Sequence, residues 1–234
     1  MNAWDDPRIA RGMQAQLVER RARIAAGDRP IGWKVGFSTP VMMDRFKITA
    51  PLVGYMMQSG MVASGGQASF KGCVKPGFEP EVAVHMGKHL ALGSDRATAS
   101  AAIAALSPAI ELVDLKFQPQ DVEPILKANV FHHGLVLGPR STAHAGGDVN
   151  GLVGTVLRNG AEVARVADLQ ATVGNILDVV RFVADTLATA GEKLAAGDVV
   201  ITGSIMVPIF IEPGETGTDF VLDPIGSASV RYAA

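Results

Sequence analysis

The stretch from Gly77 to His85 has the pattern of a β-strand that carries two acids on one face. Because side chains alternate along a strand with a period of two, Glu79 and Glu81 share a face with His85. The other face is apolar, and the small Ala83 separates the acids from the histidine. Two exposed glutamates would need no explanation, but the apolar surroundings favour a half-buried strand on which the two charges need a partner.

A third acid occupies an apolar stretch further along the chain. Glu111 interrupts the run from Pro108 to Asp114, which otherwise has the composition of a buried strand. Burying an isolated carboxylate is costly or forces it to take up a proton, so such a group is normally paired or bound to a ligand. Three carboxylates form an all-oxygen ligand set, which suits Mg²⁺ or Mn²⁺ better than Zn²⁺. On spacing alone, a divalent-metal site and three solvated or paired acids are equal alternatives.

Composition and charge narrow the class of protein. Of the 234 residues, 48% are hydrophobic and 19% are charged, which is typical of a compact globular chain. The formal charge of −2, without a basic cluster, gives no reason to expect a nucleic-acid partner. The single Cys73 excludes an intramolecular disulfide and a multi-cysteine zinc site, and no apolar run is long enough for a membrane span. We therefore expect a cytoplasmic protein with neither a nucleic-acid nor a membrane partner.

Strands outnumber helices in the pattern of the chain. Apolar periodicity predicts helices over residues 6–26, 40–47, 96–106 and 176–189. Strands are predicted over residues 31–37, 82–86, 110–115, 134–137, 198–202, 220–222 and 228–232, with a hairpin over 151–164 that turns at Asn159-Gly160. The expected fold is one α+β domain over residues 1–234, mostly β, with a helical N-terminal part of about residues 1–65 and a β-rich catalytic part of about residues 66–234. No glycine-rich nucleotide loop is present.

The acidic strands carry a resemblance to a known family. Glu79-Pro80-Glu81-Val82-Ala83, followed by Pro108 to Asp114, resembles the metal motif of the fumarylacetoacetate hydrolase superfamily. Other tracts resemble its branch of 2-keto-4-pentenoate hydratases and 4-oxalocrotonate decarboxylases, namely Ile31 to Thr39, Asn129 with Leu135 to Gly138, Gly197 to Ser204 and Gly226 to Tyr232. Each motif is weak alone, but five in the same order make the resemblance specific. It implies a rolled, mixed or antiparallel sheet with flanking helices, usually assembled as a homo-oligomer.

The resemblance implies a metal site and an acid/base residue. Mg²⁺ or Mn²⁺ would be held by Glu79, Glu81 and Glu111, with His85 near enough to orient a ligand. Lys34 lies in the Gly-aromatic-Lys-hydrophobic-Gly tract and is implied as the catalytic residue. Apolar neighbours are expected to lower the pKa of Lys34 toward a useful range, and nearby carboxylates to raise it. A surface lysine without a catalytic task is the ordinary alternative.

The resemblance also implies substrate contacts. Ser204 follows Thr202-Gly203 at a position that resembles the one near the substrate carboxylate in the family, where a hydroxyl and neighbouring amides donate hydrogen bonds. Asn129 belongs to the tract that resembles the Asn-containing turn of the branch. We therefore expect Ser204, Thr202 and Asn129 to bind substrate.

Two departures from the branch bear on the reaction. The hydratases carry Pro-Asp-aromatic-Gly after the lysine, whereas this chain has Leu52 in place of the Asp, and a leucine cannot transfer a proton. Asp44 or a histidine would have to substitute for it, or the reaction is not simple hydration. Phe131, His132 and His133 also stand where the hydratases usually have small residues. We expect at most one of the two histidines to face the site. An acid/base or substrate-contact role is the alternative for either histidine, and a structural role is the simpler interpretation of both.

The leading hypothesis is a metal-dependent hydratase that converts a 2-hydroxy-2,4-dienoate to a 4-hydroxy-2-oxo acid. Such a substrate chelates a divalent ion, which stabilises the enolate, while a positioned acid/base residue moves the proton. Decarboxylation of a 2-oxo-dienedioate is the alternative that depends less on the missing Asp. Hydrolysis of an acylpyruvate C–C bond comes third, because it usually needs a His–Glu pair that is not evident in the N-terminal part. A non-catalytic metal-binding relative is the alternative from another class, and a solvent-facing Lys34 amine would favour it.

Overall fold

The computed structural model describes residues 3–233, which form helices and two sheets. The α-helices are α1 (Pro7–Ala25), α2 (Pro40–Phe46), α3 (Arg96–Ala102), α4 (Val122–Lys127) and α5 (Ile176–Thr189), and the 3₁₀ helices are η1 (Ala3–Asp5), η2 (Gln58–Gly60), η3 (Asn129–Phe131) and η4 (Thr142–Gly147). The strands are β1 (Pro30–Gly36), β2 (Leu52–Met57), β3 (Met61–Val62), β4 (Gln67–Ala68), β5 (Pro76–Met86), β6 (Ile103–Asp114), β7 (His132–Leu137), β8 (Val153–Arg158), β9 (Ala161–Val166), β10 (Val199–Ser204), β11 (Ile209–Phe210), β12 (Gly217–Asp223) and β13 (Gly226–Tyr232).

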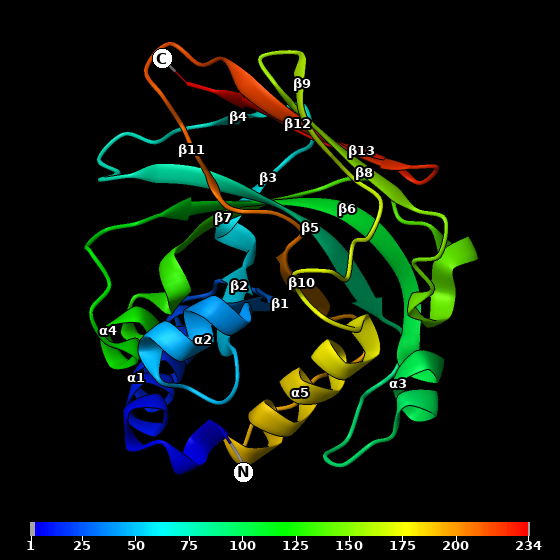
Figure 1. The fold of residues 1–234 in the computed structure, drawn as a ribbon. Helices are drawn as coiled ribbons and strands as arrows, with labels where there is room; N and C mark the ends of the chain where they lie inside the picture. Colours follow the sequence, from blue (N-terminus) through cyan, green and yellow to red (C-terminus); the bar gives the residue numbers. More distant parts are fainter. Residues whose placement is uncertain (1–2, 234) are drawn as a thin grey trace.

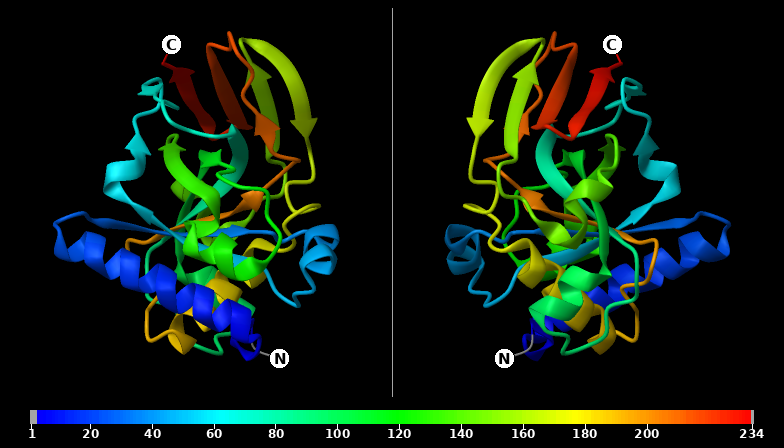
Figure 2. Two further views of the ribbon diagram at one scale, coloured as in Figure 1. Left: turned by 90° about the vertical axis from the view of Figure 1, so that its left-hand side faces the viewer. Right: turned by 90° about the vertical axis from the view of Figure 1, so that its right-hand side faces the viewer.

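The larger sheet curls around the core and the smaller one closes one end of it. Among the described residues, the larger sheet has eight strands in the order β2-β1-β10-β5-β6-β7-β3, with β11 paired to β5. The smaller has five, in the order β4-β13-β12-β8-β9. In Figure 1 the smaller sheet lies above the long, curved β5 and β6, and α1, α2, α4 and α5 lie below them. The two further views in Figure 2 show the same division between the small sheet at one end and the helices at the other. The expected mostly β, α+β fold with a rolled sheet is confirmed.

The two long helices form where the sequence predicts them. Asp6 caps α1 by accepting a hydrogen bond from the backbone N–H of Arg8 at 2.9 Å. Ile9, Met13 and Leu17 follow at four-residue spacing and are all buried, so one face of α1 packs on the core. Burial of each such side chain contributes about 1.5–3 kcal/mol. The predicted range 176–189 coincides with α5.

The predicted helix over residues 96–106 is wrong in its second half. The helix α3 ends at Ala102, and β6 begins at Ile103 and runs to Asp114. Ile103 pairs with Met86, and Leu106 pairs with Val84 of the neighbouring strand. The alanine-rich composition favours a helix, but the apolar residues from 103 onward gain more by pairing with β5 and burying in the sheet.

Strand β1 is held very close to β10 by a glycine. Gly32 has φ of +153°, and a Cβ added there would lie 1.9 Å from the carbonyl oxygen of Val199. Only glycine fits such an approach. The parallel pairing that results places Lys34 opposite Ile201, while further along β10 Ser204 lies opposite Glu81 of β5. The chain therefore brings a lysine, a serine and a glutamate from three adjacent strands into one region.

The hairpin predicted at Asn159-Gly160 is also confirmed. Both residues have positive φ, 52° and 81°, and β8 pairs with β9 across them.

No helix within residues 3–233 is both long and apolar enough to cross a membrane.

Candidate metal and acid/base site

Glu79, Glu81 and Glu111, here called the carboxylate cluster, meet in the centre of the larger sheet. Strand register places Glu79 directly opposite Glu111 on β5 and β6, and Glu81 follows two residues later on the same face of β5. Each residue offers one carboxylate oxygen, and these oxygens all lie within 4.8 Å of one another. Glu81 and Glu111 are 0% exposed, and Glu79 is half-buried. The sequence predicted these three acids together, and the structure brings them together.

Each of the two buried carboxylates has one anchored oxygen and one free oxygen. Oε2 of Glu81 accepts a hydrogen bond from the backbone N–H of Gly203 at 2.6 Å, while its Oε1 has no partner among the described residues. Oε1 of Glu111 is anchored by Lys34 and His132, while its Oε2 has no partner among those residues. A buried carboxylate oxygen without a donor is costly, and a divalent cation would satisfy both free oxygens. The donor set therefore fits Mg²⁺ or Mn²⁺.

Lys34 is buried in the same site. Its side chain is 2% exposed, and its Nζ donates to Glu111 Oε1 at 2.5 Å and to the carbonyl oxygen of Val130 at 3.1 Å. Gly54 on the neighbouring strand makes room for it, because a Cβ there would lie 2.8 Å from Lys34 Cγ. The alternative of a surface lysine is wrong, and the amine faces the carboxylates.

Electrostatic coupling within the site sets which groups carry charge. Burial, followed by the charge of Glu111, raises the pKa of Glu79 to about 7. Burial, with the charges of Glu111 and Glu79, raises the pKa of Glu81 well above its ordinary value. Burial also acts to raise the pKa of Glu111, but Lys34 and His132 outweigh it, so the pKa is lowered. Without a bound cation, Glu111 is therefore the most readily ionised member of the cluster.

The pKa of Lys34 shifts in the direction opposite to the one useful for acid/base catalysis. Burial acts to lower it, but the charges of Glu111, Glu79 and Glu81 together outweigh burial, and the pKa is raised. Of the two opposing effects expected from the sequence, the carboxylates therefore outweigh the apolar neighbours in the protein without a bound cation. A cation at the cluster would offset the carboxylate charges and move this pKa back down.

The three expected substrate contacts lie in different surroundings. Ser204 is paired with Glu81 across the sheet, and its buried hydroxyl has no partner among the described residues. The Thr202 hydroxyl donates to the carbonyl oxygen of Val82 at 3.1 Å, so it ties β10 to β5. Asn129 donates to the carbonyl of Tyr55 at 2.8 Å and accepts from its N–H at 2.9 Å, so it ties η3 to β2. Of the three, Ser204 has the hydroxyl available to a ligand.

His132 is the contact that sequence reasoning undervalued. Its Nδ1 lies 2.7 Å from Glu111 Oε1, and its side chain is 7% exposed. Burial lowers the pKa of His132 by more than Glu111 raises it, so the ring is neutral. The adjacent His133 is exposed and lies against Phe70 instead. In an extended chain, adjacent side chains point to opposite faces, so the pair alone could not tell which histidine faces inward.

Two other candidates lie apart from the cluster. His85 bonds Ser107 at 2.8 Å through Nε2, and burial, followed by the charge of Arg140, lowers its pKa to about 4. Asp44 is exposed on α2, and Leu52, which stands in place of the acid expected for a hydratase, is 1% exposed within the apolar core. No hydrogen bond joins His85 to the cluster within residues 3–233.

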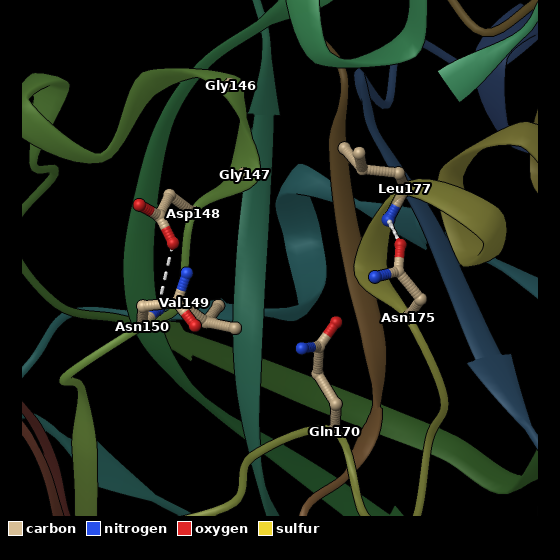
Figure 3. A pocket seen from close by; sticks show the side chains of 8 residues that line it. All are labelled: Gly146, Gly147, Asp148, Val149, Asn150, Gln170, Asn175 and Leu177. Atoms are coloured by element: carbon tan, nitrogen blue, oxygen red, sulfur yellow. Dashed lines mark hydrogen bonds between the residues drawn. The ribbon is translucent and has the colours of Figure 1, made fainter. Parts of the chain in front are cut away.

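A cavity elsewhere on the surface does not include the cluster. Its volume is about 330 Å³, and it lies between the loop after η4 and the segment that leads into α5. Figure 3 shows Asp148 and Asn150 on one side of this cavity and Gln170 and Asn175 on the other. Asn175 accepts a hydrogen bond from the Leu177 N–H, as the N-cap of α5. The polar groups here serve the local backbone.

Comparison with known proteins identifies the family. Residues 38–229 match the family model described as fumarylacetoacetate (FAA) hydrolase, C-terminal, and the chain therefore belongs to the fumarylacetoacetate hydrolase family. Among its relatives, 2-keto-4-pentenoate hydratase 2 of Dechloromonas aromatica (strain RCB) is 26% identical over 93% of this chain and 84% of the relative. The 4-oxalocrotonate decarboxylase of Pseudomonas putida is 25% identical over 99% of this chain and 88% of the relative. Both a hydratase and a decarboxylase are thus among the relatives, as the resemblance of the sequence motifs to this branch implies.

Solved structures share the fold. The 4-oxalocrotonate decarboxylase from Pseudomonas putida G7, complexed with magnesium and adipate, superposes with a TM-score of 0.88 at 24% identity and covers 100% of this chain and 90% of that one. Fumarylpyruvate hydrolase from Pseudomonas aeruginosa, in complex with Mn²⁺ and pyruvate, gives a TM-score of 0.68 at 16% identity. The match covers 88% of this chain and 89% of that one. At these identities the likeness establishes the fold.

Proposed function

We propose that this protein is a hydratase that adds water to a 2-hydroxy-2,4-dienoate to give a 4-hydroxy-2-oxo acid, with Mg²⁺ or Mn²⁺ held by Glu79, Glu81 and Glu111. One observation carries the proposal: a buried lysine amine lies 2.5 Å from a carboxylate whose second oxygen is buried and has no partner within residues 3–233. A cation site and a proton-transfer group thereby share one residue, Glu111. The hydratases among the relatives support hydration, and the decarboxylases support the second candidate given below.

The residues divide the work by their surroundings. When bound, the metal supplies a Lewis acid for the C2 oxygen of the substrate and stabilises charge that develops there. Lys34 moves the proton, because its Nζ is the titratable amine of the site and is held by Glu111 and the Val130 carbonyl. The free hydroxyl of Ser204 donates to the substrate carboxylate. Thr202 and Asn129 affect substrate binding indirectly. Thr202 holds β10 against β5, and Asn129 holds η3 against β2.

The test is a reaction followed to its product. Purified protein is mixed with 2-hydroxypenta-2,4-dienoate and Mg²⁺, the loss of dienol absorbance is recorded, and the product is identified by NMR. We expect a 4-hydroxy-2-oxo acid that forms with Mg²⁺ and fails to form after chelation with EDTA. Metal-independent conversion, or no conversion by protein that binds Mg²⁺, would refute the hydratase proposal.

A second candidate function is decarboxylation of a 2-oxo-dienedioate. The burial of Leu52 in the apolar core favours it, because no carboxylate stands at the position where the hydratases of the branch carry an Asp. The same preparation is tested with 2-oxohex-3-enedioate, and released CO₂ is measured. Release of CO₂ without hydration of the pentadienoate would assign the protein to the decarboxylases.

A further inference from the structure

Glu111 is anchored by two donors that come from different strands. Lys34 reaches it from β1 at 2.5 Å, and His132 reaches it from β7 at 2.7 Å. Both bonds end on the same oxygen, Oε1, and Oε2 has no hydrogen-bond partner in the described part of the chain. The proposed reaction uses Lys34 and the carboxylates, whereas His132 has no task in it.

The two anchors differ in how far they can move. The Lys34 ammonium ends a flexible four-carbon chain, so it is free to shift from Glu111 toward a substrate when it exchanges a proton. The His132 side chain is a planar ring on a strand, is 7% exposed, and has only two rotatable bonds. When the lysine moves, the ring is the donor that still fixes Glu111.

We propose that His132 is a positioning residue that keeps Glu111 Oε2 turned toward the metal while Lys34 serves the substrate. The inference rests on the proposed function, since it takes the cluster to be a cation site. Because the carboxylate accepts, Nδ1 of His132 carries the proton, and Nε2 has no hydrogen-bond partner among the described residues. Nε2 lies on the side of Gly60, where an added Cβ would come within 3.9 Å of it. The ring therefore acts through Nδ1 alone.

This geometry defines a matched pair of variants. The side-chain nitrogen of asparagine stands as many bonds from Cβ as Nδ1 of histidine, so His132→Asn can restore the donor to Glu111. The nitrogen of glutamine stands one bond further out, on the Nε2 side, so His132→Gln carries the same amide group in the wrong place. Both variants remove the ring, and both lose similar packing.

The experiment is a calorimetric titration of Mg²⁺ into the full chain without substrate, with thermal unfolding recorded for each variant. We expect His132→Asn to bind Mg²⁺ within about threefold of the wild type and His132→Gln to bind it about 10–100-fold more weakly, as is usual when a group that orients a metal ligand is lost. The melting temperatures of the two variants should agree. Equal Mg²⁺ affinities in the two variants, or a weaker Asn variant, would overturn the proposal.

A double-mutant cycle separates anchoring from general packing. In a Lys34→Met background His132 is the one remaining anchor of Glu111 Oε1 among the described residues, so His132→Gln should cost more Mg²⁺ affinity there than in the wild type. An equal effect of His132→Gln on Mg²⁺ affinity in the two backgrounds would contradict the shared-anchor arrangement.

The outcome is distinct from that of the activity test. A wild type that binds Mg²⁺ but does not hydrate the dienoate refutes the proposed reaction, and the role of His132 is still decided by the two affinities. A wild type that binds no Mg²⁺ overturns the cation site and the role of His132 together.

Discussion

Single residues show how the carboxylate cluster is prepared for a cation. In Glu81 and in Glu111, one carboxylate oxygen accepts hydrogen bonds from N–H donors, and the other is buried with no partner among residues 3–233. A hydrogen-bonded network built only for stability would satisfy both oxygens, because an unsatisfied buried polar atom costs about 1–3 kcal/mol. The arrangement therefore favours a ligand that binds where the two free oxygens point.

Replacement of Glu81 by glutamine should abolish metal binding. The amide keeps the shape of the side chain but removes a charge and one of the ligands, so the loss should exceed the roughly 10–100-fold seen for groups that only orient a ligand. Mg²⁺ titration calorimetry measures it, with Glu123→Gln as the control, since Glu123 pairs with Arg11 and Lys127 away from the cluster. Unchanged Mg²⁺ affinity in Glu81→Gln would exclude the cation site.

Replacement of Lys34 by methionine should separate turnover from metal binding. The ammonium repels a cation and competes with it for Glu111, so its removal should leave Mg²⁺ affinity unchanged or raised. Loss of the proton-transfer group should lower kcat by about 10²–10⁴-fold. Steady-state kinetics and calorimetry on the same preparation check both, and loss of Mg²⁺ binding as well as activity would mean that Lys34 is structural.

At the scale of elements, the site depends on how closely neighbouring strands approach. The parallel pair β1 and β10 holds Lys34 beside the cluster, and Gly32 permits their contact. The antiparallel pair β5 and β6 sets Glu79 opposite Glu111. Displacement of β1 from β10 would move Lys34, and displacement of β5 from β6 would move Glu79 or Glu111, although no functional group would be removed.

Substitution of Gly32 by alanine tests this dependence. The positive φ of residue 32 and the clash of an alanine Cβ with the Val199 carbonyl oxygen should together lower the free energy of unfolding by about 3 kcal/mol. Gly65→Ala is the control, because Gly65 also has positive φ, +81°, but open space around it, and should cost only about 1 kcal/mol. Urea unfolding of both variants measures the difference, and equal losses would show that the close approach of β1 and β10 is unimportant.

Elements could be predicted from the sequence where local patterns agree with tertiary packing. The amphipathic α1 and α5 and the Asn159-Gly160 turn follow from periodicity and turn chemistry alone. The end of α3 could not be predicted in this way. The alanine-rich sequence favours a longer helix, but the chain from Ile103 onward pairs with a strand that is distant in sequence. Strand alternation gives the face of Glu79 and of Glu111, but their register depends on long-range pairing that no local pattern encodes.

At the scale of the whole molecule, the cluster links stability to pH and to metal. In the folded protein the pKa of Glu79 is raised to about 7, above its unfolded value, so folding favours the protonated acid. The stability that this carboxyl contributes is fully present below its unfolded pKa and is lost as the pH rises through 7. Bound Mg²⁺ should reverse that loss by favouring the ionised form.

Thermal unfolding between pH 5 and 8 measures this linkage. His85 acts in the opposite sense, because its pKa is lowered to about 4 and its neutral form becomes the main species in both states as the pH rises. The informative quantity is therefore the difference between the wild type and Glu79→Gln, each without metal. We expect the wild type to lose stability relative to the variant as the pH rises, and a difference independent of pH would contradict the raised pKa.

The site as a whole was predictable only in part. The acids and Lys34 came from motifs, and the small residues Gly36 and Gly54 that flank the lysine side chain are the signal that it would be buried. His132 was undervalued because a His-His pair does not reveal which ring faces inward until the path of β7 is known. The homo-oligomer implied by the resemblance stays a prediction, for which sedimentation analysis is the measurement.

We propose that Glu79, Glu81 and Glu111 together hold one divalent cation. Crystals grown with Mn²⁺ and measured for anomalous scattering would test it most directly. We expect one strong anomalous peak within coordination distance of all three carboxylates, with Lys34 and His132 on Glu111 Oε1 and the metal on Oε2. A peak at another place, or an Mn²⁺-saturated crystal with no peak between these carboxylates, would contradict it.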